Sequence, residues 1–269
     1  MSPPMSPPIT CEYRGTILKA TNVSLTLGKN VILRDLNLEI RDIYRPGMVT
    51  GQVIGVLGPS GIGKTRLFRV LSGIDEPNTG TVTIGGDAKP VKRGMVGVIA
   101  QNYPLFEHRT VLGNLQLAAR CTGLCRKDAV AKAMAFLGRF GLEDRGDLYP
   151  CQLSGGQRQR VGLARSLAAD PPILLMDEPF GALDPITRAE LQMEFRKLQQ
   201  KLGKTIVFVT HDVGEALLLG SRIGLMESGS LRGIYTPDEF LRATDAGVKA
   251  YVDVFRAGQQ MFRNSENAI

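Results

Sequence analysis

The chain has 269 residues, enough to bury a full hydrophobic core as one large α/β domain or as a core with a subdomain. Its 43% apolar content excludes a disordered chain, and no stretch reaches the roughly 20 consecutive apolar residues that a membrane span requires. The net charge of +7 comes from basic residues spread along the chain without interleaved aromatic residues, which argues against a nucleic-acid partner and indicates a solvated surface or one near lipid headgroups.

The N-terminus and the cysteines carry little chemistry. Residues 1–14 contain a repeated Met-Ser-Pro-Pro without the basic start and apolar core of a secretory signal, so we expect a disordered tail, with translation starting at Met1 or Met5. The four cysteines, at positions 11, 121, 125 and 151, and the two histidines predict neither a disulfide framework nor a zinc site. We therefore expect reduced cytosolic thiols.

The predicted elements alternate between strand and helix. In chain order we expect antiparallel strands at 17–27 and 31–40, a polar connection at 41–51, a buried strand at 53–57, a helix at 66–72, strands at 80–86 and 95–100, a helical segment at 111–140, a strand at 173–176, a helix at 185–202, strands at 206–209 and 223–226, helices at 237–243 and 246–255, and a polar tail at 256–269. In the helical segment Val130, Met134 and Leu137 share one face, as the spacing of a helix predicts. The alternation predicts a mostly parallel sheet covered on both faces.

A glycine-rich loop follows the strand at 53–57 and fits the phosphate-loop pattern G-x-x-x-x-G-K-[ST] at every required position. Its residues are Gly58, Pro59, Ser60, Gly61, Ile62, Gly63, Lys64 and Thr65. Backbone N–H groups in such a loop point inward, and the following helix adds partial positive charge where a polyphosphate would sit. Lys64 would reach the outer phosphates and Thr65 would ligate Mg²⁺. The flanking strand and helix favour a bound nucleotide over a chance turn.

Two carboxylates stand at the exit of the apolar strand at 173–176. Asp177 suits an outer-shell grip on Mg²⁺, and Glu178 suits polarising the water that attacks a phosphoryl group. Adjacent acids after a strand are common by chance, so this prediction depends on the pairing with the phosphate loop.

The segment 153–157, Leu-Ser-Gly-Gly-Gln, makes the assignment specific. The chain resembles the nucleotide-binding subunit of the ATP-binding cassette (ABC) transporters, whose signature is LSGGQ about twenty residues before a strand-ending Asp-Glu pair. The family's motifs occur here in order, as the phosphate loop, Gln101, the signature, the acidic pair, the D-loop Ala182-Leu183-Asp184, and His211 after a strand.

The resemblance spans roughly residues 16–245 and implies the domain organisation. We expect a P-loop NTPase (RecA-like) core with a mostly parallel sheet, an N-terminal antiparallel β-subdomain, and an inserted helical subdomain at about 102–160. The chain then divides into a tail at 1–14, an ABC ATPase domain at 15–245, and a C-terminal helix and tail at 246–269.

The resemblance also implies how nucleotide is held. In the family, the signature of one subunit covers the ATP in the phosphate loop of another, so Ser154, Gly156 and Gln157 would contact a nucleotide across a dimer. A serine followed by two glycines at a helix start offers a hydroxyl and backbone N–H groups to a γ-phosphate, and the same Ser154 would cap its helix. Asp184 would also border the bound nucleotide.

Two further residues follow from motif order. Gln101 would contact Mg²⁺ and water and relay nucleotide state to a groove that receives a short helix of a membrane partner. His211 would contact the γ-phosphate and hold the attacking water with Glu178, although a lone histidine is more often structural. The expected catalytic residues are Glu178, His211 and Lys64, and the expected metal ligands are Thr65, Gln101 and Asp177.

One departure concerns adenine. The family usually stacks adenine on an aromatic residue before the first glycine turn, where this chain has Leu27 before Gly28. Leucine gives apolar contact without stacking, which predicts weaker or less base-selective binding. Tyr44, in the connection at 41–51, is an alternative source of the ring.

Residues 180–188 and 202–212 look most like importers of osmoprotectants such as glycine betaine, choline or proline, with neighbouring similarity to nitrate, sulfonate and amino acid importers. The implied cofactors are ATP and Mg²⁺. The implied partners are a second ABC ATPase subunit, permease subunits and a solute-binding protein, at the cytoplasmic face of the inner membrane. Alternatives are a lipid-organising transporter, a soluble ABC ATPase acting on nucleic acid or ribosomes, and a module that closes on ATP without turnover. Glu178 and His211 argue against the last.

Overall fold

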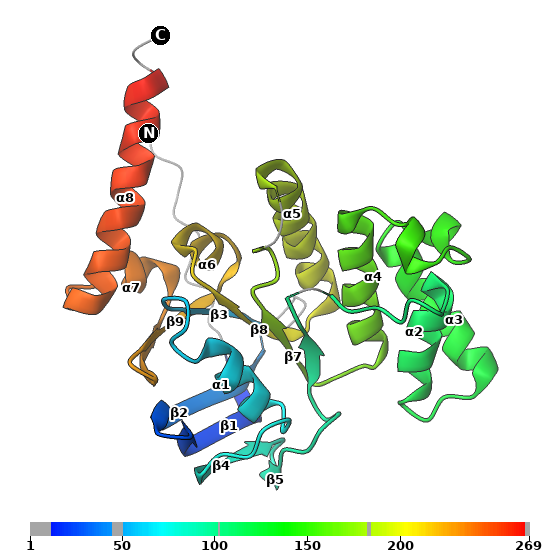
Figure 1. Cartoon of the computed structure of the whole chain (residues 1–269), viewed down its shortest axis with the longest axis horizontal. Helices are drawn as coiled ribbons and strands as arrows, with labels where there is room; N and C mark the ends of the chain where they lie inside the picture. Colours follow the sequence, from blue (N-terminus) through cyan, green and yellow to red (C-terminus); the bar gives the residue numbers. More distant parts are fainter. Residues whose placement is uncertain (1–11, 45–50, 102, 182–183, 267–269) are drawn as a thin grey trace.

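Two β-sheets and a group of helices make up the fold (Figure 1), which is described here from a computed structural model for residues 12–44, 51–101, 103–181 and 184–266. The strands are β1 (Glu12–Leu27), β2 (Asn30–Tyr44), β3 (Val53–Leu57), β4 (Thr79–Ile84), β5 (Lys89–Pro90), β6 (Gly97–Ile99), β7 (Ile173–Asp177), β8 (Thr205–Thr210), β9 (Arg222–Glu227) and β10 (Ser230–Tyr235). The helices are α1 (Lys64–Leu71), α2 (Val111–Arg120), α3 (Arg126–Arg139), α4 (Gly155–Ala168), α5 (Pro185–Leu202), α6 (Val213–Leu219), α7 (Pro237–Arg242) and α8 (Ala246–Glu266), with 3₁₀ turns at Glu143–Arg145 and Pro150–Gln152. The expected α/β architecture is confirmed.

The larger sheet has the strand order β10-β9-β3-β8-β7-β6, and all its neighbours are parallel except the β9–β10 pair. Every residue of β3 and β8 is buried, as expected for strands that are covered on both faces. The carboxyl ends of parallel strands meet at one edge of a sheet, where ligands bind in folds of this kind. The phosphate loop and His211 directly follow β3 and β8, and the acidic pair begins with the last residue of β7, so all three share that edge.

The smaller sheet has the order β2-β1-β4-β5 and is antiparallel throughout. Its inner face packs on α1 and on the larger sheet through a core that includes Leu18, Leu33, Phe68 and Val207. The turn between β1 and β2 lies on the same side as the phosphate loop, because Ile32 contacts the backbone at Gly63.

The helices α2, α3 and α4 pack together at one end of the molecule (Figure 1). The buried face of α3 consists of Ala129, Ala133 and Leu137, at a spacing of four residues. The predicted helix is confirmed, but of the residues predicted to share one face, Leu137 is buried and Met134 is 42% exposed. The small side chains of Ala129 and Ala133 face inward because they allow α3 to pack closely on its neighbours. Hydrophobicity alone would favour burial of Met134 instead.

Near both ends of the described part, from Glu12 and up to Glu266, there is more regular structure than expected. β1 begins at Glu12, inside the predicted tail. Glu12 pairs with Tyr44, so β2 extends into the predicted polar connection at 41–51. α8 runs to Glu266, which makes residues 256–266 helical although we expected a polar tail. That segment is rich in good helix formers such as glutamine, arginine and methionine, which explains the longer helix. None of the helices in the described part is both long and apolar enough to cross a membrane.

Candidate nucleotide site

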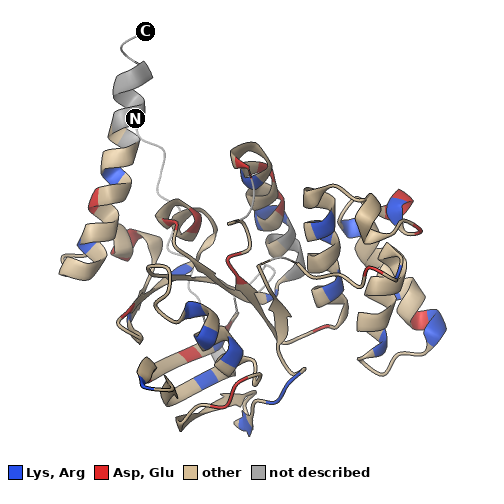
Figure 2. Ribbon diagram, viewed as in Figure 1, with Lys and Arg blue, Asp and Glu red and all other residues tan. Residues whose placement is uncertain are grey.

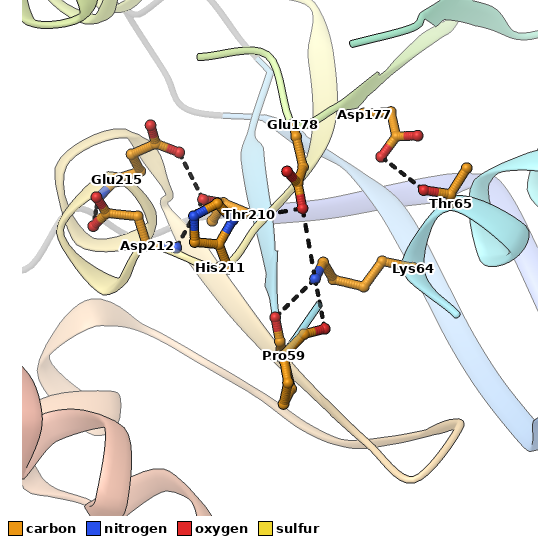
Figure 3. A network of polar contacts seen from close by, with 10 residues as sticks. Pro59, Lys64, Thr65, Asp177, Glu178, Thr210, His211, Asp212 and Glu215 are labelled. Carbon is orange, nitrogen blue, oxygen red and sulfur yellow. Dashed lines mark hydrogen bonds and ion pairs between the residues drawn. The ribbon is translucent and has the colours of Figure 1, made fainter. Parts of the chain in front are cut away.

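Lys64 points back into the phosphate loop (Figure 3). Its Nζ donates hydrogen bonds to Gly58 O and Pro59 O, each over 2.8 Å, and lies 3.8 Å from Glu178 Oε1. Burial lowers the pKa of Lys64, and the nearby charges of Glu178 and Asp177 oppose that shift. The ammonium group is therefore held at the mouth of the loop, facing the acidic pair.

Glycine is required at several positions of the loop. Gly61 and Gly63 have φ angles of +79° and +102°, in the left-handed region that favours glycine. A Cβ at Gly63 would lie 2.8 Å from Ile32 Cγ2, and one at Gly58 would lie 2.8 Å from Met226 O. The loop thus needs glycine both for its backbone shape and for its close approach to β2 and β9.

The acidic pair faces the phosphate loop. Thr65 Oγ1 donates to Asp177 Oδ1 over 3.3 Å, although the two residues are 112 apart in sequence. Burial raises the pKa of Asp177, and the hydrogen bond from Thr65 opposes the rise. Glu178 has a φ of +43°, which is uncommon for a residue with a side chain and is typical of functional positions.

Glu178 lies at the centre of the site. Its Oε1 is 3.5 Å from His211 Nδ1, and Lys64 approaches the same oxygen from the other side. Gln101 also lies nearby, because both side chains approach Gly181. A Cβ placed on Gly181 would be 3.5 Å from Glu178 Oε2 and 3.7 Å from Gln101 Nε2. His211 is 55% exposed, so it is not a packed core residue. The structure brings Lys64 and these predicted residues together at the sheet edge.

The signature residues cap α4 and lie away from the phosphate loop and Glu178. Ser154 Oγ accepts from Gln157 N over 3.3 Å, and Gln157 Oε1 accepts from Ser154 N over 3.0 Å, which forms the expected helix cap. Asp184 caps α5 by accepting from Thr187 N. Both caps line one cavity of about 520 Å³, which also includes Gly156. Figure 1 shows α4 and α1 well apart, so the signature does not face the phosphate loop of its own chain. Ala182 and Leu183 lie outside the described residues.

The Tyr44 hypothesis is wrong. Tyr44 pairs with Glu12 at one end of the β1–β2 hairpin, whereas Leu27 pairs with Asn30 at the other. At the usual rise of a strand, the 14–15 residues between these ends span about 45–50 Å. Leu27 is 40% exposed beside the turn. The end of the hairpin near the phosphate loop therefore presents a leucine at the position where the family usually has an aromatic residue.

Two buried links around Glu178 were not predicted from the sequence. Tyr103 Oη donates to Pro179 O over 2.8 Å, which ties the segment after Gln101 to the acidic pair. Glu215 accepts a hydrogen bond from Thr210 beside His211. The Glu215 position has a weak sequence signal, because a carboxylate in the apolar stretch 213–219 must find a partner. Nothing local marks Tyr103.

The family model described as "ABC transporter" matches residues 46–181, just over half of the chain. The chain belongs to the ABC transporter family. The match includes the phosphate loop, the signature and the acidic pair, whose positions in the fold are described above.

Several curated ABC transporter proteins are similar to the chain. A glycine betaine transport ATP-binding protein of Bacillus subtilis (OpuAA) is 41% identical over 234 residues, which cover 84% of this chain and 53% of the relative. A choline transport ATP-binding protein of the same organism (OpuBA) is 42% identical, with 84% and 59% covered. A sulfate/thiosulfate import ATP-binding protein of Rhizobium meliloti (CysA 2) is 39% identical, with 82% and 60% covered. The chain thus spans little more than half the length of these relatives.

A solved structure shares the ABC fold. CbiO1 from Clostridium perfringens, part of the ABC transporter complex CbiONQ, superposes with a TM-score of 0.74 at 26% identity. The superposition covers 92% of this chain and 99% of the other. The expected P-loop architecture is therefore confirmed over nearly the whole chain.

Proposed function

We propose that this chain binds and hydrolyses ATP as the motor subunit of an ABC transporter. The observation that carries the proposal is the meeting of Lys64, Glu178 and His211 at one sheet edge, with both partners within 4 Å of the same Glu178 oxygen. Phosphoryl transfer depends mainly on positioning and on electrostatic stabilisation, and this arrangement supplies a cation, a base and an orienting imidazole.

The residues present fit a nucleoside triphosphate with Mg²⁺. Among the described residues no cluster of three or more His, Cys, Asp or Glu could hold a metal ion by itself. The Thr65 hydroxyl and the Asp177 carboxylate offer two oxygen ligands, and Mg²⁺ commonly takes few protein ligands beside phosphate oxygens and water. Bound there with Gln101 nearby, Mg²⁺ would neutralise charge on the β- and γ-phosphates.

Each residue then has a defined role. Glu178 accepts the proton of the attacking water, which forms a bond to the γ-phosphorus as the bond to the β-γ bridging oxygen breaks. His211 contacts the γ-phosphate and orients that water. Lys64 leaves its loop carbonyls to neutralise the phosphates, and its buried position makes the charge effective.

The position of the signature supports a dimer. Ser154, Gly156 and Gln157 face a cavity that the phosphate loop does not line, so they need a nucleotide held by another chain. We propose that two such chains clamp two ATP molecules, with Asp184 bordering each site, and that hydrolysis opens the clamp. The second chain is a copy or a paralogue.

The proposed cargo is an osmoprotectant, taken up by import through separate permease subunits with a solute-binding protein. Support comes from the glycine betaine and choline transport relatives and from residues 180–188 and 202–212. The chain would act at the cytoplasmic face of the membrane. Figure 2 shows its Lys and Arg residues scattered over the smaller sheet, α1, α5 and the group of helices α2–α4 rather than in one stripe, an arrangement that does not suggest a nucleic-acid surface.

The test compares the parent with Glu178→Gln. We expect the parent to hydrolyse ATP, whereas the variant binds ATP, fails to turn it over and accumulates as an ATP-bound dimer in size-exclusion chromatography with Mg-ATP. Glu76→Gln is the matched control, because it makes the same chemical change at an exposed residue outside the site. Full turnover by Glu178→Gln would reject Glu178 as the base. If the parent does not hydrolyse ATP, does not dimerise with Mg-ATP and binds no nucleotide in a titration, the proposed function is rejected.

A further inference from the structure

A buried carboxylate lies in the first turn of α6, four residues after His211. Glu215 is only 6% exposed, and the proposed hydrolysis gives it no role. Burying a carboxylate is costly unless hydrogen bonds compensate it, so its partners indicate what it stabilises.

Among the described residues, two hydrogen bonds hold the Glu215 carboxylate, one at each oxygen. Thr210 Oγ1 donates to Oε2 over 2.6 Å, and Gln192 Nε2 donates to Oε1 over 3.0 Å. Thr210 ends β8 and Gln192 lies in α5, and both side chains are buried. A single carboxylate therefore joins α6 to the last residue of β8 and to α5.

The same network fixes the turn that carries His211. Thr210 Oγ1 accepts from Asp212 N over 3.0 Å, and Asp212 Oδ1 accepts from Gly214 N and Glu215 N over 2.7 and 3.2 Å. Both neighbours of His211 are thus anchored. The imidazole itself is more than half exposed, so its position depends on the backbone turn rather than on packing.

The network also borders the reaction centre. Glu178, Thr210, His211, Asp212 and Glu215 line one small cavity of about 20 Å³ together with Gly181 and Arg188. Figure 3 shows the chain of contacts that leads from Glu215 through Thr210 to the His211 turn, with Glu178 and Lys64 beyond. A displacement of Glu215 would therefore reach Glu178 through Thr210 and His211.

We propose that Glu215 is a positioning residue for His211. Through Thr210 its carboxylate fixes the turn that holds the imidazole against Glu178, and through Gln192 it ties that turn to α5, the helix that follows the acidic pair. The proposal rests on the hydrolysis proposed above and adds a residue that controls its geometry. Pre-organised sites need such support, because a misplacement of 1 Å can cost about a hundredfold in rate.

Three variants separate positioning from folding. Glu215→Gln keeps the shape and both hydrogen bonds, because its carbonyl accepts from Thr210 while its amide donates to the oxygen of a flipped Gln192. Glu215→Ala removes both bonds. Leu218→Ala is the control on the same helix, since Leu218 is a partly exposed residue outside the network.

The first readout is the imidazole NMR spectrum, which does not require activity. The chain has two histidines, His108 and His211, so His108 serves as an internal reference. We expect Glu215→Ala to shift or broaden the His211 signals alone, with Glu215→Gln and Leu218→Ala resembling the parent. Unchanged His211 signals in a folded Glu215→Ala chain would overturn the proposal. If that variant does not fold, Thr210→Val removes the same link and is expected to move the same signals.

The second readout is kinetic. We expect Glu215→Ala to lower kcat by about tenfold to a hundredfold while the dissociation constant of ADP, which lacks the γ-phosphate, stays unchanged. Glu215→Gln should restore kcat. On a His211→Ala background, Glu215→Ala should have little further effect, because the two residues act as a unit. An equal loss on both backgrounds would reject the positioning role. A parent without ATPase activity would reject the proposed function, and the NMR comparison would still decide the role of Glu215.

Discussion

The ring of Tyr103 lies directly against the backbone of Gly162 in α4, where a Cβ on Gly162 would be 2.8 Å from Tyr103 Cδ1. The buried hydroxyl of the same tyrosine donates to Pro179 O, next to Glu178. One side chain therefore connects the helix that begins at the signature with the loop that carries the proposed base. In the proposed mechanism, this link would carry a change at the sheet edge to α4.

Gly162→Ala should destabilise the fold despite the higher helix propensity of alanine. The added methyl group must displace a buried ring, which typically costs about 1–3 kcal/mol in the free energy of unfolding. The control is Gly138→Ala in α3. The new Cβ would lie 3.4 Å from its nearest neighbour, Glu143 Oε1, which is an ordinary contact, so this substitution should stabilise the fold by about 0.5–1 kcal/mol. Urea unfolding measures both. Equal effects of the two substitutions would contradict the contact.

Ser154→Ala should lose both stability and ATP-dependent dimerisation. Loss of a helix cap costs about 0.5–2 kcal/mol, and the γ-phosphate of the partner's nucleotide would lose a hydroxyl. Thr236→Ala removes a similar capping box at α7, where Thr236 and Glu239 bond each other's backbone. It should lose similar stability but still dimerise with Mg-ATP. If both variants dimerise like the parent, the signature does not contact nucleotide.

Leu27→Tyr should tighten ATP binding by about two- to tenfold, because a ring at the end of the hairpin can stack on adenine. Tyr44→Ala should leave the affinity unchanged, since Tyr44 is at the far end of that hairpin. Titration with ATP and GTP measures both affinity and base selectivity. A weaker Leu27→Tyr complex, or an affinity loss in Tyr44→Ala, would place adenine elsewhere.

The stability of Glu215→Gln relative to the parent should rise with pH. Burial raises the pKa of Glu215 above its ordinary value of 4.5, and the hydrogen bond from Thr210 opposes the rise. A carboxyl group with a raised pKa in the folded state disfavours folding when ionised, so the parent loses stability as pH rises from below 4.5 through the higher folded value. The glutamine variant has no such titration. Parallel stability curves from pH 4 to pH 7 would contradict the shift.

The sequence by itself determined the motifs whose chemistry is contiguous. The phosphate loop at 58–65, the signature at 153–157 and the acidic pair are each local, because a loop's glycines, a helix cap or a strand exit depends on residues only a few positions apart. The alternation of strands and helices likewise predicted the parallel sheet, since it reflects local hydrophobic periodicity. Family membership followed from the order of those motifs.

Only the tertiary structure decided which distant residues meet. Thr65 and Asp177 are joined across 112 positions because β3 and β7 are both neighbours of β8, and the pairing register of the β1–β2 hairpin placed Tyr44 far from the phosphate loop. The link from Glu215 to His211 emerged for the same reason. Strand order, register and helix packing fix such contacts through the burial of the whole core, and no short stretch of sequence contains that information.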